Sequence, residues 1–198
     1  MIERMSRGMS RGMSRGVVLA GASALVLAVS ACGDSATAPG GESEVISRVT
    51  LTLTPSAGGA ALSSFIDDSD GNGPTAPGAQ VGALALARGV TYTGTVKFEN
   101  RLVTPAEDIT AEVQKEANEH RVFYTVTNAG VTITTTDVDG QNRPLGVRFS
   151  KVVTPTASGL GTVRVLLCHY GNVAKVGTAT SCTGDTDISL TFNFTIAP

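Results

Sequence analysis

The chain has no tryptophan, few aromatic residues of any kind, and two histidines among its 198 residues. Ligand clefts are lined mainly by apolar and aromatic side chains; aromatics are 5% of this chain, which argues against a sugar-binding cleft. The motifs G-x-S-x-G and H-E-x-x-H and a phosphate-binding loop are also missing. Two histidines and no evident nucleophile leave little for acid–base or covalent catalysis. We therefore expect that the chain is not an enzyme.

Basic residues are scarce after the N-terminal leader, residues 1–31. The leader holds four of the 15 Lys and Arg and one of the 17 Asp and Glu, which leaves 11 basic and 16 acidic residues and a net charge of −5. Binding to nucleic acid depends on Lys and Arg that neutralise phosphates. We therefore expect no nucleic-acid partner.

The leader has the three parts of an export signal. Its positive start comes from Arg4, Arg7, Arg11 and Arg15. The apolar run Val17 to Val29 is shorter than the about 20 residues that span a bilayer, which disfavours an uncleaved anchor helix. Val29-Ser30-Ala31-Cys32 resembles the lipobox of bacterial lipoproteins. That resemblance implies cleavage before Cys32 and attachment of lipid to its side chain.

Residues 32–44 connect the lipidation site to the rest of the chain. They are mostly Gly, Ser, Ala, Thr, Pro and acidic residues, a composition that cannot pack a core and predicts a flexible tether. Two or more acyl chains would anchor the protein stably in a membrane. In the bacterial sorting rule, Asp directly after the cysteine retains a lipoprotein at the inner membrane. Gly33 stands there, so we expect the outer membrane of the cell envelope.

Alternation of apolar and polar residues predicts strands through one domain, residues 45–198. In Val90–Phe98, for example, apolar or small residues alternate with Thr and Lys. Other strands are expected at Val45–Leu53, Gln80–Leu86, Val122–Val126, Val131–Thr135, Val147–Val153, Val163–His169 and Ile188–Ile196. About eight short strands separated by Gly, Pro and Asp turns indicate a mainly β protein. We expect an antiparallel two-sheet β-sandwich, Ig-like in the loose sense.

One segment breaks the alternation. Thr104-Pro105-Ala106-Glu107 matches a capping box with Pro at the first helical position. Ile109 and Val113 follow at helical spacing. We expect one inserted helix at 105–118, with Ile109 and Val113 packed across an open end of the sandwich.

The end of this helix carries candidate metal ligands. Glu112, Glu116 and His120 are spaced by four residues and would share one face of a helix that reached His120. The other histidine, His169, would join them if the strands of the two histidines are neighbours. Imidazole and carboxylate bind zinc and other divalent ions. The alternative is a solvated acidic helix face with two unrelated histidines.

A second candidate is a turn with the pattern D-x-D-x-N-G. Asp68, Asp70 and Asn72 match the oxygen ligands in the first half of a calcium loop. A complete EF-hand is excluded, because Ala79 stands where the bidentate Glu is required. A weaker copy lies at residues 137–142. Asp-Gly and Asn-Gly steps are also ordinary turns between strands, so a turn without calcium is the alternative.

Two cysteines follow the lipidation site. Cys168 and Cys182 would meet an oxidising compartment after export, which favours a disulfide between them. Cys182 lies in a polar loop, where a free thiol would be exposed. The disulfide would connect the two strands of the last long hairpin. The alternative is two unpaired thiols, one of them buried.

Several stretches resemble a family of small uncharacterised bacterial lipoproteins. They are Val49–Pro55, Asp68–Gly73, Thr104–Thr110, Glu116–His120 with Phe123-Tyr124, and Thr186–Ile196. These proteins are often labelled as having a type 1 periplasmic-binding fold, whereas the present sequence lacks the alternating helices of that fold. The resemblance implies association with TonB-dependent outer-membrane receptors and a role in nutrient or metal capture.

Two functions follow from these features. The first is a membrane-anchored lipoprotein that binds a divalent metal (zinc or calcium) or a small ligand, in the service of an outer-membrane receptor. The alternative is a structural or interaction lipoprotein that docks a protein partner through a sheet face or edge without metal. Metal that co-purifies and is lost on His120→Ala would distinguish the two.

Overall fold

Nine strands and one helix are found in residues 44–71 and 73–197, the part of the chain that the computed structural model describes. The elements are β1 (Arg48–Pro55), β2 (Leu62–Asp67), β3 (Ala85–Leu86), β4 (Thr91–Glu99), α1 (Ile109–Lys115), β5 (His120–Val126), β6 (Val131–Thr135), β7 (Arg148–Val153), β8 (Gly159–His169) and β9 (Asp185–Ile196). The predicted leader, the lipidation site Cys32, the tether up to residue 43, and Asn72 lie outside the described residues.

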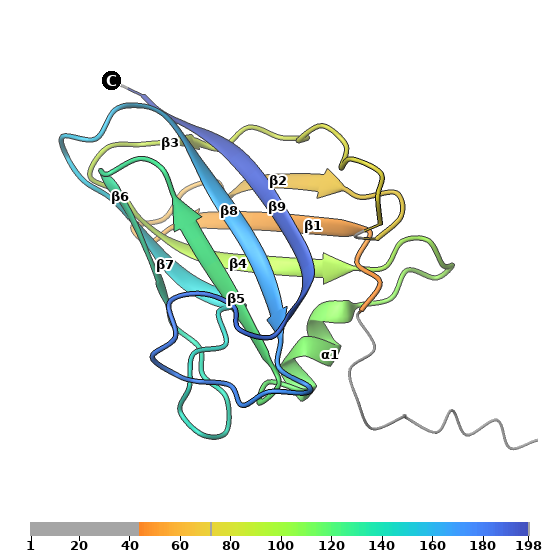
Figure 1. The fold of residues 1–198 in the computed structure, drawn as a ribbon. Helices are drawn as coiled ribbons and strands as arrows, with labels where there is room; N and C mark the ends of the chain where they lie inside the picture. The colour runs from red at the N-terminus through yellow and green to blue at the C-terminus, as the bar shows by residue number, and fades with distance from the viewer. Residues whose placement is uncertain (1–43, 72, 198) are drawn as a thin grey trace, which may run out of the picture. The chain divides into compact units, whose positions relative to one another are not determined.

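The strands form two facing sheets (Figure 1), which confirms the predicted β-sandwich. One sheet has the order β2-β1-β4-β7-β6, and the other has the order β3-β9-β8-β5. Every pair is antiparallel except β3–β9, which is parallel. The expected all-antiparallel pairing is therefore wrong at that edge. Strand β2 was not predicted, since its buried Ser64 interrupts the apolar pattern.

The core lies between the two sheets, where alternate residues of each strand point inward. In β4 the residues Tyr92, Gly94, Val96 and Phe98 are buried, and the threonines and the lysine between them face outward. A Cβ atom on Gly94 would lie 2.1 Å from the Phe149 ring, so only glycine fits at that point of the core. The predicted alternation therefore gives the correct inward face.

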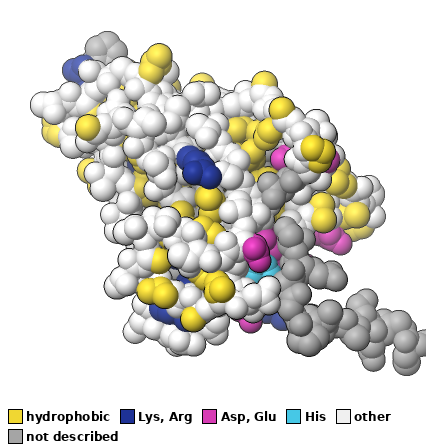
Figure 2. Space-filling view, in the orientation of Figure 1, with side chains coloured by type: hydrophobic (Ala, Val, Ile, Leu, Met, Phe, Trp, Pro, Cys, Tyr) yellow, Lys and Arg dark blue, Asp and Glu magenta, His cyan; other side chains and the backbone are white. Residues whose placement is uncertain are grey.

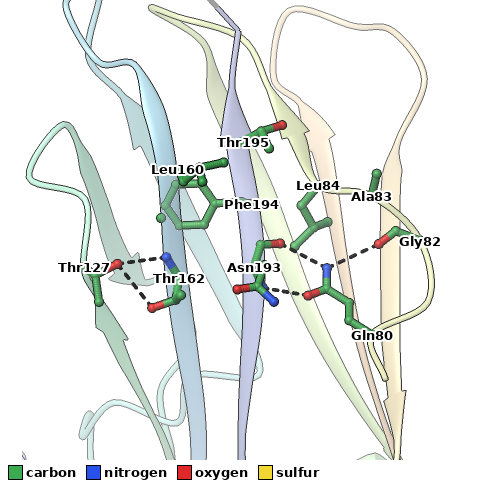
Figure 3. Close-up of a pocket in the computed structure, with 11 residues that line it drawn as sticks. Gln80, Gly82, Ala83, Leu84, Thr127, Leu160, Thr162, Asn193, Phe194 and Thr195 are labelled. Carbon is green, nitrogen blue, oxygen red and sulfur yellow. Dashed lines mark hydrogen bonds between the residues drawn. The ribbon is translucent and has the colours of Figure 1, made fainter. Parts of the chain in front are cut away.

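The segment between β2 and β3 closes one side of the sandwich. Val81 pairs with Phe65 of β2 through two backbone hydrogen bonds of 2.8 and 2.9 Å. The side-chain amide of Gln80 pairs with the backbone of Asn193 in β9: the Asn193 N–H donates to Gln80 Oε1 at 2.6 Å, and Gln80 Nε2 donates to the Asn193 carbonyl at 3.0 Å (Figure 3). The segment thus joins one edge of each sheet.

Helix α1 covers one end of the sandwich, as predicted. Asp108 is its N-cap, and its side chain accepts a hydrogen bond from the backbone N–H of Ala111. Ile109 and Val113 are buried in the core at exposures of 4% and 0%. No helix in residues 44–71 and 73–197 has the length and apolar content to cross a membrane.

The predicted capping box and helix length are wrong. Glu107 is paired with Asn100 through two backbone hydrogen bonds of 2.9 and 3.2 Å, so it cannot occupy the first helical turn. The helix therefore begins later, at Ile109. It also ends early, with Glu116 as its C-cap, and a turn over residues 116–119 leads directly into β5.

Candidate metal centre

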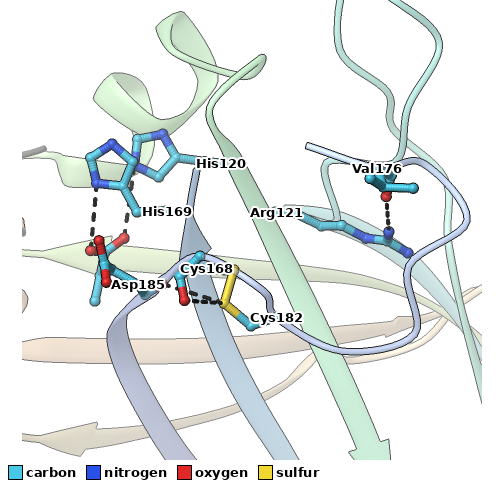
Figure 4. Close-up of a disulfide and its surroundings, with 9 residues drawn as sticks. His120, Arg121, Cys168, His169, Val176, Cys182 and Asp185 are labelled. Carbon is cyan, nitrogen blue, oxygen red and sulfur yellow. Dashed lines mark hydrogen bonds and ion pairs between the residues drawn. A yellow bond between two sulfur atoms is a disulfide. The ribbon is translucent and has the colours of Figure 1, made fainter. Parts of the chain in front are cut away.

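Two histidines meet at the end of the sandwich beside α1. His120 begins β5, His169 ends β8, and the two are direct partners in the β5–β8 register. Each continues the inward-facing row of its strand, behind Val122 in β5 and Leu167 in β8. Their rings lie against each other, as Figure 4 shows. They stack with their centroids 4.4 Å apart. The two histidines therefore meet under the condition stated for the sequence, that their strands are neighbours.

Two carboxylates complete the group, and neither was predicted. Glu44 precedes β1; its Oε1 lies 3.0 Å from His120 Nε2 and its Oε2 lies 3.8 Å from His169 Nδ1. Asp187 is in β9; its Oδ2 lies 3.8 Å from His120 Nε2 and its Oδ1 lies 3.7 Å from His169 Nδ1. The sequence gives no signal for Glu44, because it stands in a polar stretch before the first strand.

Asp187 faces inward because of a β-bulge. The register between β8 and β9 shifts, so that Ile188 pairs with Leu167 and Thr186 pairs with Cys168. Asp187 is therefore an extra residue in β9, and both Asp187 and Ile188 are buried. Bulges re-aim side chains in this way, often next to functional sites. Strict alternation predicts that Asp187 lies on the outer face of the sheet. For this reason the sequence pattern did not indicate it as a ligand.

The four side chains are largely withdrawn from solvent. His120 and Asp187 have no exposed side-chain surface, and Glu44 and His169 retain 10% and 8%. Burial lowers the pKa of His120, but the Glu44 and Asp187 carboxylates outweigh it, so that the pKa is raised overall. Burial raises the pKa of Glu44, and the neighbouring His120 outweighs that effect, so that this pKa is lowered. The site therefore favours an ionised Glu44 carboxylate beside a cation, either protonated His120 or a metal ion.

The orientation of the His120 ring is set by a backbone carbonyl. Nδ1 lies 3.3 Å from the carbonyl oxygen of Glu116, which can only accept, so Nδ1 carries the proton. The Nε2 lone pair of a neutral ring is then turned toward Glu44 Oε1 at 3.0 Å. Nε2 is buried and has no aligned hydrogen-bond partner in the described part of the chain. A second proton on His120 or a bound metal ion would give both Nε2 and Glu44 Oε1 a partner.

The spacing of the ligand atoms suits a metal ion. One ligand atom from each of the four side chains lies within 4.8 Å of all the others. Tetrahedral zinc with bonds of about 2.1 Å holds its ligand atoms roughly 3.4 Å apart. The four distances between a histidine nitrogen and a carboxylate oxygen span 3.0 to 3.8 Å, and each carboxylate faces His120 with one oxygen and His169 with the other. The group could therefore hold a divalent metal ion.

The predicted ligands Glu112 and Glu116 do not belong to this group. The predicted helical face is wrong, because α1 ends at Lys115 and His120 lies in a strand. Glu112 is exposed on α1. Glu116 is placed near His120, but its contact with the ring is made by its backbone carbonyl. The four-residue spacing thus correctly indicated that Glu116 lies near His120, although the two residues do not share a helical face.

The predicted disulfide between Cys168 and Cys182 is confirmed and lies next to the histidines (Figure 4). Cys168 directly precedes His169, and Cys182 lies in the loop that leads to Asp187. A Cβ atom on Gly184 would lie 2.0 Å from the backbone oxygen of His169, so the loop passes too close to β8 for any larger residue. The disulfide therefore closes the hairpin that carries two members of the group.

The predicted calcium residues lie elsewhere, in the connection after β2. Asp70 Oδ2 accepts a hydrogen bond of 2.8 Å from the backbone N–H of Thr75, and hydrogen bonds from Thr75 lower the pKa of Asp70. Asp68 is 3% exposed, and its Oδ1 lies 3.4 Å from the Asp70 nitrogen. Asn72 is outside the described residues. Calcium binding here stays a prediction.

The weaker calcium copy holds a buried ion pair instead. Asp139 Oδ2 lies 3.0 Å from Lys175 Nζ and 2.7 Å from Arg143 Nε. Burial raises the pKa of Asp139, but hydrogen bonds from Arg143, Lys175 and Gln141 outweigh it and leave this pKa well below its usual range. The carboxylate thus already has two cationic partners.

A groove over β8 and β9 is another candidate site (Figure 3). It is lined by uncharged side chains, among them Gln80, Thr162, Asn193 and Leu160. This lining contains no imidazole, carboxylate or thiol. The histidine–carboxylate group is therefore the stronger candidate for a functional site.

Comparison of the chain with protein-family models, with curated proteins and with solved structures finds no significant match. The resemblance to small bacterial lipoproteins stays a prediction from the sequence. Inference of a function therefore depends on the geometry of the histidine–carboxylate group.

Proposed function

We propose that this protein is a lipid-anchored metal-binding module of the bacterial cell envelope. It binds one divalent transition-metal ion, with zinc as the best match, through Glu44, His120, His169 and Asp187. The observation that carries the proposal is the buried Nε2 of His120. Its ring is oriented by the Glu116 carbonyl so that this nitrogen faces Glu44 Oε1 at 3.0 Å. A metal ion between the two atoms would use both lone pairs.

The donor set favours zinc over calcium. Calcium takes six to eight oxygen ligands, typically about 2.4 Å away. Two of the four side chains here offer imidazole nitrogen, which suits zinc and neighbouring transition metals. The backbone hydrogen bond to His120 Nδ1 is the kind of outer contact that orients metal-bound histidines.

The envelope location rests on other features of the chain. The stretch ending in Cys32 resembles a lipobox, and the small polar residues up to position 43 suit a tether. A disulfide between Cys168 and Cys182 fits an oxidising compartment. Capture of metal for an outer-membrane receptor is the role that the sequence resemblance implies.

The test is the metal content of the full chain. The protein would be exported in a bacterial host, purified in detergent without chelator, and analysed by mass spectrometry for bound elements. We expect close to one equivalent of zinc or another divalent transition metal. His120→Ala should lose it, because the substitution removes the buried nitrogen at the centre of the group.

The matched control is Glu112→Gln. It removes a carboxylate that the sequence predicts as a ligand but that lies exposed on α1. This variant should keep its metal. A wild-type chain that holds no metal, and takes up none on addition of zinc, would refute the proposed function and leave the docking of a protein partner as the better account.

A further inference from the structure

His169 presents one ring nitrogen to the buried group and the other to the exposed side chain of Glu119. Its Nδ1 lies 3.8 Å from Glu44 Oε2 and 3.7 Å from Asp187 Oδ1. Its Nε2 lies 3.9 Å from Glu119 Oε2. The Glu119 side chain is 58% exposed, compared with 8% for His169. A path from Glu119 past His169 therefore leads from the surface to the other ligands. Figure 2 shows acidic side chains beside the exposed part of a histidine.

We propose that Glu119 is the entry residue of the metal site. Its carboxylate holds an arriving cation beside His169 Nε2, and the ion then passes the His169 ring to reach the four ligands. Glu119 is not one of those ligands in the bound state. The inference rests on the proposed function, because it assigns a route to the same site.

Exposure and distance single out Glu119. His120 and Asp187 have no exposed side-chain surface and cannot receive an ion from solvent directly. Among the described residues, Glu119 is the exposed carboxylate that lies within 4 Å of a histidine nitrogen. A carboxylate at the mouth of a site raises the local concentration of cations and their rate of association.

The backbone holds Glu119 in place while leaving its side chain at the surface. The Glu119 N–H donates to the Glu116 carbonyl at 2.8 Å, and the Glu119 carbonyl accepts from the Tyr170 N–H at 2.7 Å. The second bond ties the turn after α1 to the residue that follows His169. Substitution of the Glu119 side chain should therefore leave the fold and the four ligands intact.

The experiment is stopped-flow measurement of zinc binding to the metal-free full chain in detergent. Zn²⁺ alone is the probe, and Glu119→Gln is compared with Asp185→Asn. Asp185 is exposed and pairs with His169 in the strand register, but its carboxylate is not within 4 Å of either histidine nitrogen. It therefore controls for the loss of one negative charge at this end of the molecule.

We expect Glu119→Gln to slow zinc association and dissociation by the same factor, about threefold or more, because one charge at the entrance is lost. The equilibrium affinity should then change by less than about twofold, because a residue that acts only on the path to the site changes the on- and off-rates by the same factor. Asp185→Asn should leave both rates near those of the wild type.

Each of the following results would overturn the inference. An unchanged association rate in Glu119→Gln shows that ions do not enter past this residue. An equal slowing in Asp185→Asn shows a general effect of charge. A loss of affinity through faster dissociation alone shows that Glu119 is a ligand. If the wild-type chain binds no zinc, both the proposed function and this inference are overturned. If zinc binding depends on His120 but its rates do not depend on Glu119, only this inference is overturned.

Discussion

The imidazole rings of His120 and His169 stack at an angle of 28° with their centroids 4.4 Å apart. The contact follows from strand pairing, since the two residues face each other in the β5–β8 register. Both are fixed on regular strands, which hold side chains more precisely than loops do. The bulge in β9 and the chain before β1 then bring Asp187 and Glu44 against the same two rings.

The first prediction concerns the ligands that the sequence pattern missed. Asp187→Asn keeps the size of the side chain and removes its charge, so it should weaken zinc binding at least about tenfold, the lower end of what even outer-shell changes cost. Competition with a fluorescent chelator would measure the affinity. Asp185→Asn, two residues away and exposed, is the control. If Glu116→Gln instead abolished binding while Asp187→Asn did not, a different ligand set would be at work.

The second prediction concerns the disulfide. The double substitution Cys168→Ala and Cys182→Ala opens a loop of sequence separation 14. A loop of that size is worth about 3 kcal/mol in the chain-entropy account. The melting temperature should fall, and zinc affinity should fall with it, because His169 lies in this loop next to Cys168 and Asp187 follows shortly after Cys182. Thermal unfolding with and without zinc measures both effects, and a variant with wild-type zinc affinity would show that the strands alone position the ligands.

The sequence predicted the sandwich well because alternation reports directly which face of a strand is buried. β4 is such a case, with four inward residues between outward threonines. β2 was missed because Ser64 is buried and donates hydrogen bonds of 3.1 and 2.9 Å to the carbonyls of Val81 and Gly82. Its role depends on partners about 18 residues away along the chain, which a local pattern does not report.

The two histidines, which are half of the candidate site, were predictable from the composition of the chain. His120 and His169 are the two histidines of the chain, so any imidazole site had to use them. Asp187 was not predictable, because it faces inward through a bulge that departs from strand alternation. Glu44 was assigned to the tether, since nothing in its neighbours indicates that the chain folds back against β5 and β8.

The third prediction concerns the buried ion pair of Asp139 and Lys175. Asp139→Asn should destabilise the protein by about 3 to 5 kcal/mol, because it leaves the Lys175 ammonium buried without its counter-charge. Urea unfolding would measure this. The double variant Asp139→Asn with Lys175→Met should recover part of the loss, since no buried charge then remains at that position. A single Asp139→Asn substitution that proved neutral would show that the backbone carbonyl of Ala117 is a sufficient partner for the Lys175 ammonium.

The fourth prediction concerns Lys151, a lysine in the core between the two sheets. It is 1% exposed, and its Nζ has no hydrogen-bond partner in the described part of the chain and lies 4.2 Å from the centre of the Phe194 ring. Burial lowers the pKa of Lys151 to about 8, from an ordinary value of 10.5. Below the lower value both the folded and unfolded chains hold the proton, and the folded chain carries the whole penalty of a buried charge. Between the two values the unfolded chain binds the proton that the folded chain has released, so stability must rise with pH in that window.

The rise from this one group should amount to about 3 kcal/mol across the window. Lys151→Met should raise the free energy of unfolding at neutral pH by about 1 to 3 kcal/mol, because it replaces the buried ammonium with an apolar side chain of similar length. It should also flatten the dependence on pH between about 8 and 10. Denaturant unfolding at several pH values would measure both, with the exposed Lys115→Met as control. The difference between wild type and variant is the informative quantity, since burial also raises the pKa of Tyr124 and its titration alters stability at higher pH in both proteins. A Lys151→Met variant that is less stable than wild type at neutral pH would show that the contact with Phe194 outweighs the penalty of burial.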